Sequence, residues 1–272
     1  MTKGDVMIIF DTKGDFYQKF YDANKDYVIG NSRTYRSQSV SWNVFREITV
    51  NGYTEDNLEE LYLFSREIAQ GFFEEKQSQQ QPFFVNAATE VLTAVLYQAL
   101  WCNMDEPVEI KTQNLSNETL SRLFDLWEVS DFCRFISTNE KLKSTLALIG
   151  MPMVDDDGQY IFDDDGNQVF RSGDEAQNSV YTEILIAIRD ILIGVFAQEG
   201  KFSVQKFVRQ KGGHTLFIEY DLAMGSVLSP IYRMLIDLAL KESLGREKSD
   251  GNVYLIIDEL KLLPKLNIYK MQ

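Results

Sequence analysis

Two short apolar runs, each followed by an aspartate, lie near the two ends of this 272-residue chain. Residues 6–10 read Val-Met-Ile-Ile-Phe and precede Asp11, and residues 253–257 read Val-Tyr-Leu-Ile-Ile and precede Asp258 and Glu259. Continuous runs rich in β-formers are typical of strands buried on both faces of a parallel sheet. Ligands of such sheets gather at the carboxyl ends of the strands, so we expect both aspartates at that edge.

The sequence between these runs has mostly helical spacing. The polar break Ser-Gln-Gln-Gln-Pro at residues 78–82 is the best boundary before this region. Further strands are expected over 27–29 and 215–220. Ser229-Pro230 and Gly245 are of the types that begin and end helices, so the chain after residue 215 forms a βαβ unit with parallel strands. Helical spacing covers residues 54–72, 86–101, 117–127, 139–149 and 174–198, with Thr54 and Asn117 as capping residues.

These patterns predict an α/β protein in which a parallel sheet with flanking helices carries a large all-helical insert. We expect the sheet domain from residues 1–80 and 200–272 and the insert from residues 81–199. The length is ample for a core. The longest apolar stretch, 184–197, is interrupted by Arg189-Asp190. It therefore falls short of the ~18 apolar residues of a membrane span.

The chain is acidic, with 41 Asp and Glu residues against 27 Lys and Arg residues and a formal net charge of -14. This balance favours solubility and argues against general affinity for nucleic acid or anionic membranes. Cys102 and Cys133 lie in helical apolar patterns without metal-like spacing, which indicates buried, reduced thiols. The first residues carry no signal-peptide pattern, so we expect a cytoplasmic protein.

Residues 154–170 contain two acidic turns, Asp-Asp-Asp-Gly and Asp-Asp-Asp-Gly-Asn, around a short apolar stretch. Asp-Gly steps between apolar residues indicate a short β-hairpin. A calcium loop is the alternative, but an EF-hand needs a ligand five residues before its glycine and a Glu six after it. Those positions hold Met153 and Asp164 for Gly158, and Ile161 and Ser172 for Gly166. The hairpin interpretation is therefore favoured.

The run at 253–257 has the form of a Walker B strand, because it ends in Asp258-Glu259. An aspartate there can hold Mg²⁺ through its water shell, and the next glutamate can activate an attacking water. Alone, the same ending also fits a strand that meets a solvated turn. The matching Walker A pattern, G-x-x-x-x-G-K-[ST], does not occur in the sequence. We therefore expect this chain by itself neither to bind ATP tightly nor to hydrolyse it.

Several segments together resemble the nucleotide-binding domain of type IV secretion coupling proteins, the hexameric conjugative DNA-transfer ATPases. The most distinctive are Ile-Phe-Asp-Thr-Lys-Gly-Asp-Phe at 9–16 and Ser-Trp-Asn-Val-Phe-Arg-Glu at 41–47. Leu-Phe-Ile-Glu-Tyr at 216–220, the Walker B run at 254–259 and Leu-Leu-Pro at 262–264 are similar too. The resemblance covers nearly the whole chain, including the order of two sheet segments around a helical insert.

The resemblance implies a partial RecA-like motor domain and an all-α domain that helps to select DNA–protein substrates. It makes Asp258 the magnesium-associated residue and Glu259 the catalytic carboxylate, with Asp11 and Lys13 near the nucleotide in unassigned roles. ATP and Mg²⁺ would be the cofactors of the intact protein. The family's usual proline after the first aspartate is Thr12 in this chain.

The resemblance also implies partners and a location. A relaxase or nucleoprotein substrate, other secretion-system proteins and DNA would be the partners. The intact protein would be a hexamer at the cytosolic face of the inner or cell membrane, whereas this chain alone would be a monomer or small oligomer. The family's membrane helices, Walker A and later motor strands do not occur in the sequence, so we expect a piece of a longer protein.

One cluster combines basic and aromatic residues between the insert and the returning sheet. Its phenylalanines are Phe202 and Phe207, and His214 follows as the lone histidine, expected to be structural. Basic grooves with stacking aromatics bind single-stranded nucleic acid. An exposed connector is the ordinary alternative and is favoured, because short basic clusters are weak motifs. The candidate nucleic-acid residues are Lys201, Lys206, Arg209 and Lys211.

Two functional hypotheses follow. The first is that the chain is the core of a coupling ATPase that recruits and pumps DNA or nucleoprotein; it requires strands 6–10 and 253–257 to be neighbours in one parallel sheet. The alternative is a non-enzymatic recognition module, in which the helical insert binds partner proteins such as a relaxase. The acidic charge, the missing Walker A motif and the large helical share motivate the alternative.

Overall fold

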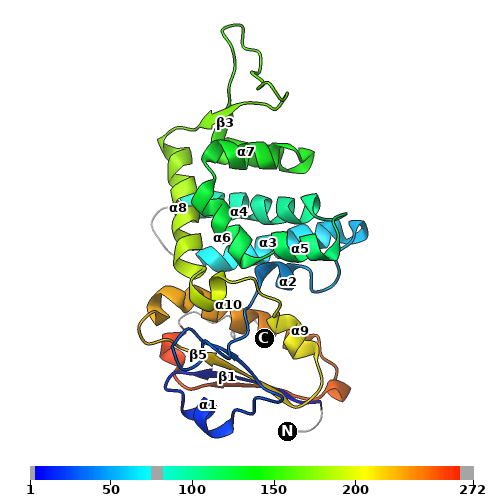
Figure 1. Ribbon diagram of the computed structural model, residues 1–272, viewed down its shortest axis with the longest axis vertical. Helices are drawn as coiled ribbons and strands as arrows, with labels where there is room; N and C mark the ends of the chain where they lie inside the picture. The colour runs from blue at the N-terminus through cyan, green and yellow to red at the C-terminus, as the bar shows by residue number, and fades with distance from the viewer. Residues whose placement is uncertain (1–3, 75–81, 264–272) are drawn as a thin grey trace. The chain divides into compact units, whose positions relative to one another are not determined.

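The computed structural model describes residues 4–74 and 82–263, which divide into two compact units (Figure 1). The sheet unit comprises residues 1–51 and 190–272, and the helical unit comprises residues 52–189. Each unit has its own buried side chains and is described separately below.

The sheet unit contains four parallel strands in the order β2-β5-β1-β6. These strands are β1 (Val6–Asp11), β2 (Tyr27–Ile29), β5 (His214–Glu219) and β6 (Val253–Ile257). Residues 6–10 of β1 pair in register with residues 253–257 of β6. The neighbour relation that the first hypothesis requires is therefore confirmed, and β1 lies between β5 and β6.

Alternation along β1 explains how both faces of the sheet are buried. Ile9 lies in one row with Phe217 and Val28, and this row packs with Tyr35 and with α1 (Asp15–Phe20). Phe10 points to the opposite face. There its ring lies 5.7 Å from the ring of Tyr232 on α10 (Gly225–Leu244). Figure 1 shows α1 on one side of the sheet and α9 (Val204–Arg209) and α10 on the other.

The helix between β5 and β6 begins earlier than Ser229-Pro230 predicts. Asp221 accepts the backbone N–H groups of Ala223 (2.8 Å) and Met224, and this turn starts α10 at Gly225. A side chain at Gly225 would meet the ring of Tyr220. Pro230 consequently lies inside the helix, which ends at Gly245 as predicted. The remaining short elements of the sheet unit are α2 (Val44–Ile48), η3 (Gly194–Ala197), η4 (Lys248–Asp250) and η5 (Leu260–Leu262).

The helical unit is built around α4 (Pro82–Cys102), whose apolar residues face neighbours on nearly every side. α4 is long and apolar enough to span a membrane, but 78% of its apolar window is buried within the fold, as in a core helix. The other elements are η1 (Glu55–Asn57), α3 (Leu58–Phe73), α5 (Val108–Asn114), α6 (Asn117–Leu126), α7 (Val129–Ser137), η2 (Glu140–Leu148) and α8 (Glu175–Ile191).

Two predicted helix boundaries differ from the observed ones. Ser116, rather than Asn117, caps α6, because its hydroxyl accepts the N–H of Thr119 at 3.1 Å. The helix predicted over 174–198 ends at Ile191, because Gly194 adopts a positive φ of 58°. The predicted helix over 139–149 is a 3-10 segment, η2, capped by the Asn139 side chain.

The division of the chain falls at other residues than the predicted domain boundaries. α3 packs along α4 and buries Leu61, Ile68 and Phe72, so residues 52–74 group with the helical unit and not with the sheet. The return to the sheet unit begins at Asp190 instead of residue 200. The periodicity of α3 indicates a helix but does not specify its packing partner.

The acidic segment forms two consecutive tight turns beyond the two-stranded ribbon β3 (Gly150–Pro152) and β4 (Phe170–Ser172). Antiparallel bridges join Val154 to Tyr160 and Phe162 to Gln168 around the two Asp-Gly turns. The hairpin interpretation agrees with this geometry.

Candidate functional site

Asp11 lies at the carboxyl end of β1, as predicted, but its carboxylate is engaged in local structure. One oxygen accepts the N–H of Gly14 and the other that of Tyr17, both at 2.9 Å. The side chain is buried and starts α1 in place of a conventional capping residue. Gly14 has φ 75°, and a Cβ there would meet the Tyr35 hydroxyl. The Asp-Thr-Lys-Gly-Asp motif therefore encodes a tight strand-to-helix turn.

This turn delivers Thr12 to Asp258 at the end of the neighbouring strand. The Thr12 hydroxyl donates a hydrogen bond to the Asp258 carboxylate. The Asp258 N–H donates to the carbonyl of Phe10 at 3.1 Å, which continues the β1–β6 ladder past Ile257. Thr12 is buried whereas Asp258 is exposed, so a fixed hydroxyl orients an accessible carboxylate. Thr12 was not among the predicted site residues; its only sequence signal was the departure from the family's proline.

Lys13 and Glu259, the other predicted residues of this edge, are both exposed to solvent. Lys13 follows directly on Thr12, and Glu259 follows directly on Asp258. The structure thus brings together the two sequence segments that carry all four predicted residues. Only Asp11 is withdrawn from the surface.

A second carboxylate, Glu219, closes the same edge at the end of β5. It accepts the backbone N–H of Ser32 at 3.0 Å, and burial raises its pKa. Burial, together with the nearby charges of Asp11 and Glu219, raises the pKa of Tyr35 to about 12. Tyr35 consequently stays a neutral phenol at the back of the edge.

The residues of this edge fit Mg²⁺ only in a water-rich form. The described residues contain no group of three or more His, Cys, Asp or Glu side chains placed to hold a metal ion. Asp258 offers an accessible carboxylate, while both oxygens of Asp11 already accept backbone N–H groups. Mg²⁺ commonly takes one or two carboxylates, retains waters and completes its shell with phosphate oxygens.

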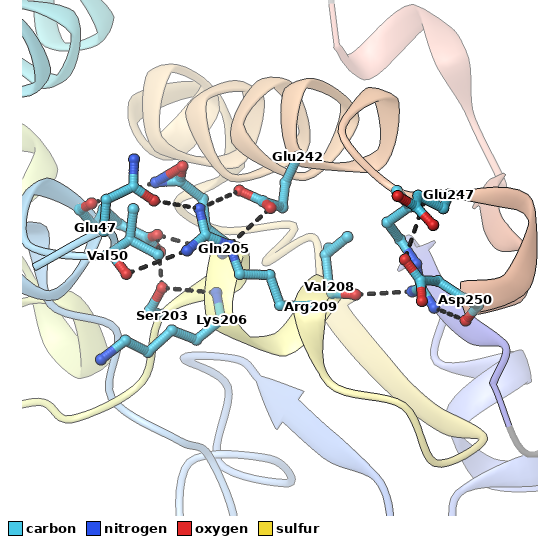
Figure 2. Close-up of polar contacts among 12 residues, drawn as sticks. Glu47, Val50, Ser203, Gln205, Lys206, Val208, Arg209, Glu242, Glu247 and Asp250 are labelled. Atoms are coloured by element: carbon cyan, nitrogen blue, oxygen red, sulfur yellow. Dashed lines mark hydrogen bonds and ion pairs between the residues drawn. The ribbon is translucent and has the colours of Figure 1, made fainter.

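The Trp-Asn-Val-Phe-Arg-Glu segment has a structural role that sequence reasoning did not anticipate. Glu47 is fully buried, and its carboxylate accepts hydrogen bonds from the Trp42 indole (2.7 Å) and the Ser203 hydroxyl (2.8 Å). It also accepts the N–H groups of Val204 (2.6 Å) and Gln205 (3.3 Å) at the start of α9. Burial raises the pKa of Glu47, and these donors oppose that rise. The motif therefore joins α2 to α9 (Figure 2).

The basic cluster divides into two paired and two exposed side chains. Arg209 forms a two-pronged pair with Glu242 (2.7 and 3.0 Å) and also donates to the carbonyl of Val50 (Figure 2). Lys211 pairs with Asp250. Lys201 and Lys206 point into solvent. The four residues therefore do not form one continuous cationic surface.

The aromatic members of this cluster are engaged in packing. Phe207 is buried, and the ring of Tyr27 lies 5.5 Å from that of Phe202 and 5.7 Å from that of Phe207. His214 packs beside Tyr27 and contacts the carbonyl of Lys25 at 3.1 Å, as expected of a structural histidine. These rings are not available as stacking platforms for bases.

Comparison with known proteins identifies relatives of this fold. The family model for the type IV secretion-system coupling protein DNA-binding domain matches residues 1–151 and 166–272. A solved structure of the bacterial conjugative coupling protein TrwBdeltaN70, in its unbound form, is similar with a TM-score of 0.66 and 19% identity. That match covers 97% of this chain and 51% of the other. A comparison with curated proteins gives no match.

Two further TrwB structures contain nucleotides. One is in complex with the non-hydrolysable GTP analogue GDPNP and the other with ADP and Mg²⁺. Each is similar with a TM-score of 0.65 and 19% identity over 97% of this chain and 52% of the other. This chain thus spans about half the length of the solved structures that it matches.

Proposed function

Because this chain belongs to the family of type IV secretion-system coupling proteins, we propose that it is part of an ATPase that moves DNA or nucleoprotein during conjugation. The observation that carries the proposal is the hydrogen bond from Thr12 to Asp258, which joins the two family motifs across adjacent parallel strands. That edge is where open α/β sheets bind ligands. Nucleotide and Mg²⁺ in the TrwB complexes support the same use of the site.

In this proposal each residue of the edge has a separate task. Asp258 holds Mg²⁺ through water, and Glu259 takes the proton of the attacking water. Bound Mg²⁺ would supply charge neutralisation on the phosphates. Thr12 keeps the Asp258 carboxylate in one orientation, and Asp11 fixes the turn that carries Thr12 and Lys13. Lys13 is exposed beside this edge and would approach the nucleotide as a cation.

The phosphate cradle is the part that this chain does not supply, because its sequence holds no Walker A pattern. We therefore propose that the 272-residue chain alone binds ATP weakly and does not turn it over. The intact protein would be a hexamer at the cytosolic face of the membrane, with a relaxase or nucleoprotein and other secretion proteins as partners.

DNA is a further proposed partner, and the family model is that of a DNA-binding domain. Lys201 and Lys206 are the members of the basic cluster with exposed, solvent-directed side chains. They are the best candidates for phosphate contacts, since Arg209 and Lys211 are held by Glu242 and Asp250.

The alternative of a recognition module is compatible with this proposal. The helical unit is compact and has its own core around α4, as a separate binding module requires. A pull-down with the 272-residue chain that recovers no transfer protein would count against this role.

ATP binding and turnover, measured on this chain and on a version extended upstream in its gene, test the motor proposal. We expect nucleotide binding and turnover only in the extended version, and a loss of turnover with Glu259→Gln. Absence of nucleotide binding in both would overturn the assignment of Asp258 and Glu259.

A further inference from the structure

The segment between β3 and β4 is a feature of this chain that the family match does not include. The match leaves out residues 152–165, which carry the two acidic turns. Figure 1 shows this segment extending beyond β3, away from α7. No task in the motor proposal uses it.

The segment is held in one conformation by a repeated set of hydrogen bonds. In each turn one aspartate, Asp155 or Asp163, accepts backbone N–H groups two and four residues ahead at 2.8–3.1 Å. Three residues spaced by eight then bond in a ring: Met153 donates to Val169, Val169 to Ile161 and Ile161 to Met153, at 2.9–3.0 Å. A segment ordered in this way loses little conformational freedom when it binds a partner.

Large apolar side chains are exposed on this ordered segment. Tyr160 is 59% exposed, Phe162 58%, Val154 50% and Met151 43%. Single exposed apolar residues are ordinary, but four within twelve consecutive positions form a patch of the kind that marks an interaction site.

A cavity of about 430 Å³ adjoins this patch. Its wall includes Leu146, Ala147, Met151, Tyr160 and Phe170, so two members of the patch also line the cavity. The Gln177 amide, also in the wall, donates to the carbonyls of Ala147 (2.8 Å) and Gly150 (3.3 Å) and is thereby satisfied. Lys143 lines the cavity as well and pairs with Glu140 at 2.5 Å. The cavity is thus apolar and large enough for one anchoring side chain.

The surroundings of the cavity are strongly anionic. Residues 150–172 contain six aspartates and one basic residue, Arg171. Asp163 lies 4.0 Å from Arg134 and is partly neutralised. The four other turn aspartates, Asp156, Asp157, Asp164 and Asp165, are fully exposed. An occupant of the cavity therefore meets an apolar seat within a negative field, and charge complementarity requires it to be cationic.

We propose that residues 150–170 and the adjoining cavity form a docking site for a basic segment of a partner protein that carries one apolar anchor residue. The anchor enters the cavity against Met151, Tyr160 and Phe170, and flanking lysines or arginines face the exposed aspartates of the two turns. This inference goes beyond the motor function, and because its test uses no nucleotide, either proposal can fail without the other.

The test is fluorescence anisotropy of the 272-residue chain with a labelled 12-residue peptide that has one leucine between lysines and arginines. We expect micromolar binding that weakens as salt is raised, because exposed charges are screened. Replacing the peptide leucine by serine should weaken binding about tenfold or more, since burial of one leucine side chain is lost. The double variant Met151→Ser, Tyr160→Ser should have the same effect.

A charge variant and a matched control separate specific docking from general attraction. Asn at 156, 157, 164 and 165 should weaken binding and reduce its salt dependence, while Asp155 and Asp163 are kept to preserve the turns. The control removes four exposed charges elsewhere in the helical unit: Asp105→Asn, Glu106→Gln, Glu109→Gln and Glu118→Gln. It should bind within about twofold of the original chain.

Three outcomes would overturn the proposal: no binding at peptide concentrations up to about 100 μM, equal binding of the leucine and serine peptides, or equal loss in the charge variant and its control. Thermal unfolding of each variant shows that the fold is retained. The substituted side chains are exposed, so their loss should leave the unfolding temperature nearly unchanged.

Discussion

At the scale of single residues, three buried or half-buried carboxylates of the sheet unit serve structure rather than chemistry. Asp11 starts α1, Glu219 holds the turn after β2, and Glu47 gathers donors from α2 and α9. The accessible carboxylates Asp258 and Glu259 are the ones left for ligands. The sequence presents all five as acids near strand or helix ends and does not distinguish these roles.

Glu47→Gln tests the buried network. The amide NH₂ would face N–H and O–H donors, so we expect a loss of about 2–4 kcal/mol in the free energy of unfolding. Because the pKa of Glu47 is raised in the folded state, the folded protein holds this proton more tightly than the unfolded chain. Its contribution is therefore full below the ordinary carboxyl pKa of 4.5 and falls as the pH rises through the raised value.

Urea unfolding of both proteins across this pH range checks the expectation. The stability difference between the original chain and Glu47→Gln should shrink as the pH rises. A difference that is independent of pH would show that Glu47 titrates in the folded state as it does in the unfolded chain.

Thr12→Val tests the orientation of Asp258. The isosteric change removes the hydroxyl donor, and hydrogen bonds to charged groups contribute about 1.5–3 kcal/mol. In the version extended upstream, we expect about tenfold weaker Mg²⁺ dependence of binding for a fluorescent ATP analogue, measured by Mg²⁺ titration. Thr12→Ser keeps the donor and should restore the original titration midpoint. Equal midpoints for Val and Ser would mean that the hydroxyl does not position Asp258.

At the scale of elements, the aromatic cluster of the helical unit should dominate the stability of α6 and α7. Phe132 is buried, stacks on Phe124 at 4.6 Å and meets the edge of Trp127 at 5.2 Å. Phe132→Ala should cost about 3–5 kcal/mol by cavity formation. Phe83→Ala, at a position 60% exposed, should stay within about 0.5 kcal/mol. Denaturant unfolding compares the two; similar losses would contradict the packing described.

Elements with a clear local pattern could be predicted, and short elements that depend on distant partners could not. The four strands are apolar runs whose burial is visible locally, and α4 is apolar on all sides. α1 and α9 have only six residues each and are stabilised from outside, by the Asp11 and Glu47 carboxylates. No local signal indicates such a stabilising contact.

The candidate site shows the same limit. The parallel-sheet rule places Asp11 and Asp258 at one edge, and the structure agrees. The rule does not say that Asp11 turns inward or that Thr12 reaches Asp258, because both depend on the conformation of one turn. Likewise, the pairing of Arg209 with Glu242 joins two helices and is not visible in the spacing of the basic cluster.

At the scale of the whole molecule, a net charge of -14 makes DNA binding depend on a few exposed cations. Lys201→Ala with Lys206→Ala should lower the slope of log affinity against log salt by about 2, as each lost phosphate contact removes about one unit. Lys19→Ala with Lys141→Ala, at exposed positions elsewhere, is the matched control. Fluorescence titration with a labelled single strand measures both, and equal slopes would exclude Lys201 and Lys206 from the contact.

The order of strands in the sheet also governs how the chain acquires its fold during synthesis. β1 emerges first, yet its neighbours β5 and β6 follow only after the entire helical unit. At about 5–20 residues per second, the ribosome needs several seconds to proceed from the end of the helical unit to β6. Residues 52–189 can therefore fold while the unpaired edges of β1 are still exposed. The nascent sheet is consequently the part of this protein that most needs chaperone protection.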